Sequence, residues 1–305
     1  ADPVHEQRIR DIVLEEVPEL RVTLSSDVLP EFKEYERMST TAINAYVMPA
    51  VEAYLRRLME SLADIGMRSS LHIMQSNGGL MGWETASQRS VHTVLSGPAA
   101  GVLGAVRLAS MVQEQNIITI DMGGTSFDVC LSHGGEPSFA VESDIGGHVI
   151  KAPMIDIKTL GAGGGSIGWI DAGGALQVGP QSAGADPGPA CYAKGGLEPA
   201  VTDANLVLGY LNPDYFLGGE MHLDVNLARE AIERDIAKPL AMTVEAAAEG
   251  MLRVVNAAMI RGIRVVSVER GYDPRDFVLV CFGGAGPVHA VTLAQELSIP
   301  KILVP

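Results

Sequence analysis

Apolar residues recur at steps of three and four along Thr41–Ile65, and this spacing predicts a long helix that Gly66 ends. Pro49 lies within that segment and should kink the helix or mark its first turn. Short apolar runs predict strands over Arg21–Leu24 and Leu71–Gln75.

A helix of small residues is predicted over Ser96–Gln115, because a serine followed by Gly-Pro opens it. Two apolar strands follow, Asn116–Asp121 and Phe127–Ser132, and only Met122–Ser126 separate them. This arrangement predicts a hairpin with a glycine-bearing tip. The glycine- and proline-rich segment 133–200 is interpreted as β-rich with ordered loops.

The last third of the chain alternates helix and strand patterns. A buried strand at Phe277–Phe282, a helix at Gly286–Leu297 and the start of a strand at Ile302–Val304 form a βαβ unit. Further helices are predicted over Asp203–Tyr210, Asn226–Ile236 and Thr243–Val266. The fold class is therefore α/β.

Composition narrows the possible partners of the 305-residue chain. A net charge of −15 excludes the basic face that nucleic acids require, and disfavours an anionic membrane surface. Apolar runs stay short of a membrane span, and the start lacks a signal-peptide pattern. Three widely spaced cysteines fit core positions in a reducing cytoplasm better than disulfides, a zinc site or a nucleophile.

The strongest chemical pattern is Asp121-Met-Gly123-Gly124-Thr125-Ser-Phe-Asp128 at the predicted hairpin tip. Exposed N–H groups of such a tip can form a nest for phosphate oxygens, and Thr125 adds a hydroxyl donor. Asp121 can hold Mg²⁺ or orient an attacking nucleophile. The alternative is a tight hairpin whose two aspartates only satisfy turn N–H groups, and local chemistry leaves the two interpretations equal.

A second glycine turn follows the strand that ends at Phe282. Gly283, Gly284, Ala285 and Gly286 would permit flat, close approach of a ligand, and the helix that begins there favours anions. Taken alone, the segment fits an ordinary turn between strand and helix better.

Two motif matches in the segment 163–168 are rejected. Gly163–Gly168 fits the dinucleotide pattern G-x-G-x-x-G, and Gly164–Gly168 fits the nucleophile pattern G-x-S-x-G. Both motifs must open a helix, whereas the following Trp169–Val178 resembles a β-hairpin. Gly161–Ser166 is either a corner required by packing or a loop beside nucleotide or substrate.

Other polar residues have structural alternatives. Asp186, Asp203 and Asn205 could coordinate a cation, but Asp203 fits a helix cap better. The seven histidines form no paired arrangement and fit surface or core roles better than metal ligation.

The helix, hairpin and later Gly-Gly turn together resemble the actin, sugar kinase and heat-shock ATPase superfamily. More specifically, the chain resembles the hydantoinase A/oxoprolinase family, which includes ATP-dependent N-methylhydantoinase, 5-oxoprolinase and an acetone carboxylase subunit. The resemblance covers most of residues 90–305 and rests on GAGGGS at 161–166, SAGADPGPACY at 182–192, VTDAN at 201–205, FLGG at 216–219 and FGGAGP at 282–287.

The resemblance implies a ribonuclease-H-like (actin-like) ATPase fold. Residues 1–95 would be the tail of a first lobe, and 96–305 the second lobe with a glycine-containing, β-rich insertion. The family also carries an earlier Asp-x-Gly-Gly-Thr hairpin, which has no counterpart before residue 90. We therefore expect a fragment of a larger protein that is inactive alone.

The implied reaction is ATP-dependent opening of a cyclic amide or imide, such as a hydantoin or 5-oxoproline, through a phosphorylated carbonyl. Asp121 and Asp128 would be catalytic, with Mg²⁺ on Asp121. Phosphate would lie on Gly123, Gly124 and Thr125, and adenosine on the Gly283–Gly286 turn. Candidate substrate contacts are Asp156, Gly163, Gly164 and Ser166.

Family members often work with a second subunit, so we expect a partner of the hydantoinase/oxoprolinase B type and an oligomer. Two alternative functions stay open. One is an acetone carboxylase-type subunit that carboxylates a phosphorylated enol, and the other is a nucleotide-gated binding module.

Overall fold

The computed structural model describes residues 2–305, which divide into two compact units. Unit 1 comprises residues up to Leu103 together with Ser138–Asp156, and unit 2 comprises Gly104–Pro137 and Ile157–Pro305. The boundary after Leu103 falls inside a helix, and the predicted assignment of residues 1–95 and 96–305 to two lobes remains a prediction.

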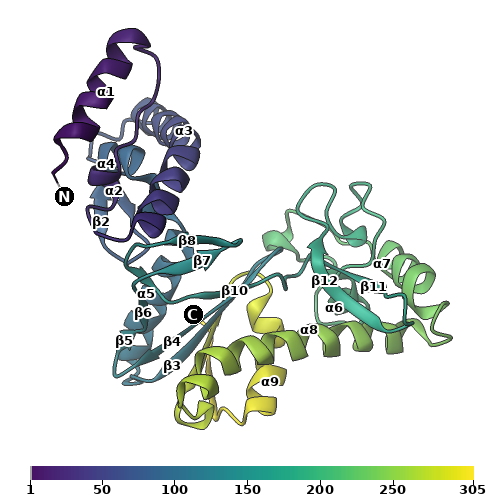
Figure 1. The fold of residues 1–305 in the computed structure, drawn as a ribbon. Coiled ribbons are helices and arrows are strands. Elements are labelled where there is room, and N and C mark those ends of the chain that lie inside the picture. The colour runs from purple at the N-terminus through teal and green to yellow at the C-terminus, as the bar shows by residue number, and fades with distance from the viewer. Residues whose placement is uncertain (1) are drawn as a thin grey trace. The chain divides into compact units, whose positions relative to one another are not determined.

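Unit 1 is built around the long helix α3, which contains Pro49 (Figure 1). The buried amide of Asn44 ties this helix to the next segment, since its Nδ2 donates to Gln88 O at 2.9 Å and its Oδ1 accepts from Val91 N at 3.0 Å. The elements of unit 1 are α1 (Val4–Glu16), α2 (Ser25–Val28), α3 (Glu34–Asp64), β1 (His72–Met74), β2 (Leu80–Gly82), α4 (Trp83–Gln88), a 3-10 turn (Ser90–Thr93), the start of α5 (Ser96–Met111), β6 (Phe139–Ala140), β7 (Ser143–Ile145), β8 (His148–Ile150) and β9 (Met154–Ile155).

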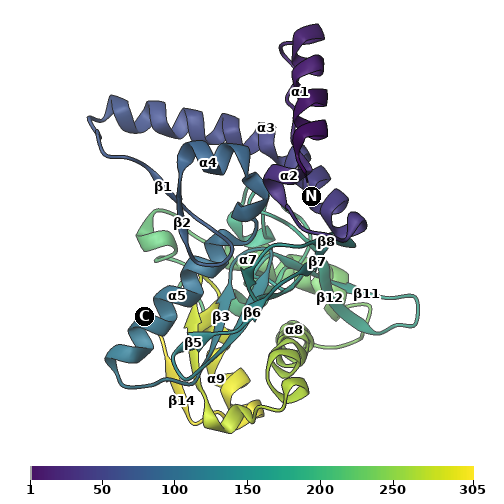
Figure 2. The same cartoon turned by 60° about the vertical axis from the view of Figure 1, so that its left-hand side comes forward.

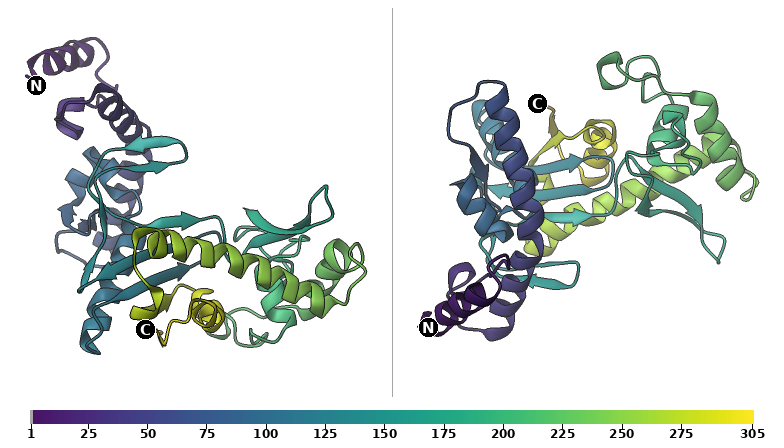
Figure 3. Two further views of the ribbon diagram at one scale, coloured as in Figure 1. Left: turned by 60° about the horizontal axis from the view of Figure 1, so that its bottom comes forward. Right: turned by 90° about the horizontal axis from the view of Figure 1, so that it is seen from above.

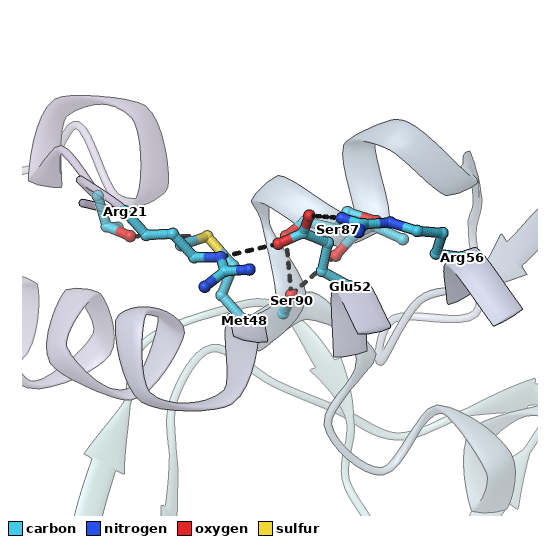
Figure 4. A network of polar contacts seen from close by, with 8 residues as sticks. Arg21, Met48, Glu52, Arg56, Ser87 and Ser90 are labelled. Atoms are coloured by element: carbon cyan, nitrogen blue, oxygen red, sulfur yellow. Dashed lines mark hydrogen bonds and ion pairs between the residues drawn. The ribbon is translucent and has the colours of Figure 1, made fainter. Parts of the chain in front are cut away.

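The predicted strand Arg21–Leu24 is wrong. The segment has no regular structure and no pairing partner, and it leads into α2. Its side chains are engaged on α3 instead: Arg21 Nε donates to Glu52 Oε2 at 2.9 Å, and Arg56 binds the other oxygen of the same carboxylate (Figure 4). The hydrogen bond from Arg21 lowers the pKa of Glu52.

Unit 2 contains a six-stranded sheet in the order β10-β4-β3-β13-β14, with β5 added on β4. The β3–β4 pair is the predicted antiparallel hairpin. Strand β13 lies parallel to β14, as the βαβ unit requires, and it is also parallel to β3. The strands are β3 (Ile117–Met122), β4 (Phe127–His133), β5 (Glu136–Pro137), β10 (Lys158–Leu160), β13 (Val278–Phe282) and β14 (Lys301–Leu303).

Successive side chains of β3 point to opposite faces of this sheet, and both faces are packed. Ile118, Ile120 and Met122 join the main core with α8 (Val244–Val266) and α9 (Gly286–Leu297). Ile117 points to the other face, where it packs with Ala105 and Ala109 of α5. Figure 2 shows α5 on one side of the strands and α8 and α9 on the other.

The part of unit 2 outside the sheet also packs against the helix α8 (Figure 3). Beyond the sheet α8 packs against the hairpin of β11 (Ser166–Ile170) and β12 (Leu176–Ser182), and against α6 (Val201–Val207) and α7 (Val225–Ile232). Thr243 caps α8 as its position predicts, with Oγ1 accepting from Ala246 N at 3.2 Å. Within residues 2–305, no helix combines the length and hydrophobicity needed to cross a membrane.

Candidate nucleotide site

The tip of the β3–β4 hairpin is open and nearly free of side chains. Gly123 N donates to Ser126 O at 3.2 Å and closes the turn, while Gly124 and Thr125 are exposed. A Cβ built on Gly123 or Gly124 would meet no atom within 4 Å. The space in front of the tip is therefore available to a ligand.

The loop Gly161–Ser166 holds this tip from behind. Gly164 N donates to Gly123 O at 2.9 Å, and Gly165 N donates to Gly124 O at 2.6 Å. A Cβ on Gly163 would lie 2.6 Å from the carbonyl of Gly124, so the two backbones can touch only because a glycine stands there.

These two hydrogen bonds fix the direction of the N–H groups at the tip. In a trans peptide the C=O and N–H point in opposite directions. Because the carbonyls of Gly123 and Gly124 face the loop, the N–H groups of Gly124 and Thr125 point away from it. Among residues 2–305, no acceptor binds either N–H group. Two adjacent donors aimed at open space match the nest that phosphate oxygens occupy.

The second glycine turn lies beside the same strand. Strand β13 pairs with β3 so that Phe282 lies opposite Asp121, and Ala285 N donates to Met122 O at 2.9 Å. Gly283 has φ +79°, and a Cβ there would lie 2.3 Å from Asp121 Oδ1. Only glycine fits this position, since both its conformation and its surroundings exclude a side chain.

Gly164 is the point where the three glycine segments meet. A Cβ on Gly164 would lie 2.9 Å from Thr202 Oγ1 and 3.8 Å from both Ala285 Cβ and Gly123 O. Segments widely separated in sequence thus form one backbone-lined site within unit 2.

Asp121 and Asp128 lie opposite each other in the β3–β4 ladder. Partial burial raises the pKa of Asp121, and the negative charge of Asp128 raises it further. Thr159 on β10 donates its hydroxyl to Asp128 Oδ1 at 2.5 Å. No sequence pattern singled out Thr159, because only the pairing of β10 with β4 places it opposite Asp128.

The predicted metal site rests on these two carboxylates. Residues 2–305 bring no three His, Cys, Asp or Glu side chains together as a protein-only metal site would need. Magnesium commonly uses one or two carboxylates and takes its other ligands from water and substrate phosphates. The Asp121–Asp128 pair fits an ion that arrives with a nucleotide, and Mg²⁺ on Asp121 remains a prediction.

The predicted substrate residues lie in different places. Gly163, Gly164 and Ser166 are buried behind the hairpin, and Ser166 Oγ accepts from Gly163 N at 2.8 Å. Asp156 belongs to unit 1, where its N–H donates to Ser138 O at 2.9 Å. Contact of these residues with a substrate stays a prediction, whereas the support that Gly163–Gly165 give to the hairpin is observed.

Both rejected motifs are absent as structural elements. Ser166 opens β11, which returns through an antiparallel hairpin to β12, so no helix follows the glycines. The exclusion of a dinucleotide fingerprint and of a nucleophile elbow is confirmed.

The predicted cap residue Asp203 lies inside α6, and the cysteines lie in the core as predicted. Asp203 is fully buried at the third position of the helix, and its carboxylate accepts from the N–H of the N-cap residue Ala200 at 2.8 Å. All three cysteines are buried, and burial raises the pKa of the Cys191 thiol and that of Cys281, the latter to about 12. Such thiols stay protonated at neutral pH and are poor nucleophiles.

Unit 2 is thus an α/β structure in which three glycine segments lie around the end of β3, where Asp121 stands. The sequence profile of the hydantoinase/oxoprolinase family matches residues 37–305, and the chain belongs to this family. The resemblance seen in the sequence is confirmed.

Three relatives illustrate its range. Caprolactamase subunit alpha of Pseudomonas jessenii is 46% identical over 100% of this chain and 44% of its own length, and the crystal structure of that ATP-dependent caprolactamase superimposes with a TM-score of 0.82. A nucleotide-free acetone carboxylase structure gives a TM-score of 0.90 at 35% identity, over 99% of this chain and 43% of the other. The 5-oxoprolinase 1 of Arabidopsis thaliana is 40% identical over 99% of this chain and 25% of its own length. The chain thus spans less than half the length of these relatives.

Proposed function

We propose that this chain supplies ATP-binding elements to an ATP-dependent hydrolase that opens a cyclic amide or imide ring. The observation that carries the proposal is the outward direction of the Gly124 and Thr125 N–H groups at an open hairpin tip beside Asp121. Phosphate would occupy this tip, and adenosine would lie against Gly283–Gly286. Two similar structures support this assignment, since one is named an ATP-dependent caprolactamase and the other concerns ATP-dependent acetone carboxylation.

The chemistry explains why ATP is needed. An unstrained amide is a poor electrophile, and phosphorylation of its carbonyl oxygen creates a leaving group on the ring carbon. Water then attacks that carbon and the C–N bond breaks, which leaves an acyl phosphate on the ring-opened product. A second water attacks the same carbon, and phosphate departs with the former carbonyl oxygen and leaves a carboxylate. Catalysis depends mainly on positioning and charge stabilisation.

Individual residues take distinct parts in this scheme. Asp121 would bind Mg²⁺ or orient the attacking oxygen, and Asp128 would lie beside it as a second carboxylate. Magnesium, when bound, would neutralise charge on the transferred phosphate. Asp156, Gly163, Gly164 and Ser166 are proposed near the substrate, the last three acting through the loop behind the hairpin.

The fold of the whole protein is proposed to be ribonuclease-H-like (actin-like), with residues 1–95 completing a first lobe and 96–305 forming the second. The buried thiols suit a reducing cytoplasm.

A protein partner is part of the proposal. Caprolactamase subunit alpha and the acetone carboxylase beta subunit of Xanthobacter autotrophicus are named as subunits of larger enzymes. A second subunit of the hydantoinase/oxoprolinase B type would complete hydrolysis, within an oligomer.

A second candidate function is carboxylation of a phosphorylated enol. The TM-score of 0.90 with acetone carboxylase favours it, although sequence identity with the caprolactamase subunit is higher. A nucleotide-gated binding module is the remaining alternative.

The test is ATP consumption by the full-length protein with its partner subunit. We expect a hydantoin, 5-oxoproline or another lactam to stimulate ADP release. If a small ketone with bicarbonate stimulates ADP release instead, the protein is a carboxylase subunit and the hydrolase proposal is wrong. Tight ATP binding without any substrate-linked turnover would favour the binding module.

A further inference from the structure

The short helix α6 begins directly behind the loop that supports the phosphate hairpin. Thr202, in its first turn, is 7% exposed. Its backbone N–H and its hydroxyl both donate to Gly164 O, at 2.7 and 2.8 Å. Gly164 in turn donates to Gly123 O, so two consecutive hydrogen-bonding steps connect Thr202 with the hairpin tip.

One turn further along α6, Asn205 reaches toward α9. Its Nδ2 lies 3.4 Å from Nε2 of His289, and both side chains are 2% exposed. Nδ1 of His289 lies 2.7 Å from Oδ1 of Asn256 on α8. A carboxamide oxygen only accepts, so the ring carries its proton on Nδ1 and accepts from Asn205 at Nε2.

This second contact lies next to the other glycine turn. His289 is in the first turn of α9, which starts at Gly286 immediately after Gly283–Ala285. Asn205 Oδ1 is buried without a hydrogen-bond partner among the described residues. A buried polar atom left unsatisfied costs stability, which purely structural packing would avoid.

Asp203 holds α6 itself in place between these two contacts. Its carboxylate accepts from Cys191 N at 2.8 Å and Ala190 N at 3.2 Å, in addition to Ala200 N at the start of the helix. The residues 201–205 therefore anchor the helix through Asp203, contact the loop behind the hairpin through Thr202 and contact His289 of α9 through Asn205.

We infer that α6 is a positioning element that sets the phosphate hairpin and the adenosine turn relative to each other, through Thr202 on one side and Asn205–His289 on the other. This inference rests on the proposed nucleotide site. It assigns Thr202 and His289 as positioning residues that do not themselves touch the nucleotide.

Separate measurements of ATP and adenosine binding test this inference, because adenosine lacks the phosphates that the hairpin would hold. In the full-length protein, Thr202→Val keeps the shape of the side chain and removes the hydroxyl. We expect it to weaken ATP binding about fivefold to tenfold, as loss of one buried hydrogen bond implies, and to leave adenosine binding unchanged. Thr202→Ser should restore ATP binding.

His289→Gln should act on the other turn. It should weaken the binding of ATP and the binding of adenosine by the same factor, because both ligands contain the nucleoside. Thr119→Val is the matched control, since Thr119 is also a buried threonine of unit 2 and its hydroxyl donates to Cys130 O at 3.3 Å, away from the glycine turns. That variant should leave both affinities unchanged.

The outcomes separate this inference from the proposed function. If the wild-type protein binds neither ATP nor adenosine, the nucleotide site itself is wrong. If it binds both, but Thr202→Val and His289→Gln bind them as the wild type does, or if Thr202→Val weakens adenosine binding as much as ATP binding, α6 has no positioning role. The same holds if Thr119→Val has an equal effect.

Discussion

The carboxyl group of Asp121 has one neighbour on each side of its strand. Asp128 lies opposite on β4 and raises the pKa of Asp121 by its charge, while burial raises it more. On β13 the glycine at 283 lets the turn approach Asp121 without a side chain between them. The sequence identified all three residues, but their contact depends on strand pairing over a long separation in the chain.

Asp121→Asn should abolish ATP turnover in the full-length protein. The amide keeps the size of the side chain but removes the charge that would bind Mg²⁺ or orient the attacking oxygen, so a loss of at least about a hundredfold is expected. Steady-state ADP release measures it. Asp171→Asn is the control, because Asp171 accepts only turn and side-chain hydrogen bonds in the β11–β12 hairpin. Unchanged turnover in a folded Asp121 variant would refute the assignment.

Gly283→Ala should destabilise the protein by at least about 2 kcal/mol, since φ is +79° and the new Cβ would overlap Asp121 Oδ1. The neighbouring Gly284→Ala is the matched control: a Cβ there meets no atom within 4 Å and φ is not positive. Urea unfolding of both variants makes the comparison. Equal stabilities would show that the turn does not lie against Asp121 in this way.

At the scale of elements, periodic segments were predictable and non-local contacts were not. The helix Gly286–Leu297 and the β3–β4 hairpin follow from apolar spacing and glycine placement. The strand predicted at Arg21–Leu24 fails because a short strand-like segment alone does not supply a partner strand. The burial of Gly163–Ser166 could not be foreseen either, because it results from a backbone-to-backbone contact with the hairpin.

The His289 network joins α6, α8 and α9 and should make stability depend on pH. Burial lowers the pKa of His289 from 6.5 to about 4. Between these values the unfolded chain binds a proton that the folded protein does not, so stability falls as pH decreases through this window. Relative to His289→Gln, the wild type should lose about 2 kcal/mol more between pH 7 and pH 5. Denaturant unfolding at both pH values checks this, and parallel pH profiles would contradict a buried neutral histidine.

For the whole molecule, all three glycine segments lie in unit 2, which contains the sheet and the buried α8. The family relationship was predictable because five short motifs lie in one chain. The division into compact units was not predictable. The segment Ser138–Asp156 belongs to unit 1, although residues of unit 2 separate it from the rest of unit 1 in the sequence. Because the chain spans less than half the length of its relatives, ATP turnover should be measured on the full-length protein with its partner.

The most direct test of the proposed reaction uses a lactam substrate labelled with oxygen-18 at its carbonyl. If ATP phosphorylates that oxygen and both water molecules attack the former ring carbon, the label leaves with phosphate, and mass spectrometry should find one oxygen-18 atom in each inorganic phosphate released. Unlabelled phosphate, with the oxygen-18 retained in the ring-opened carboxylate, would contradict the account.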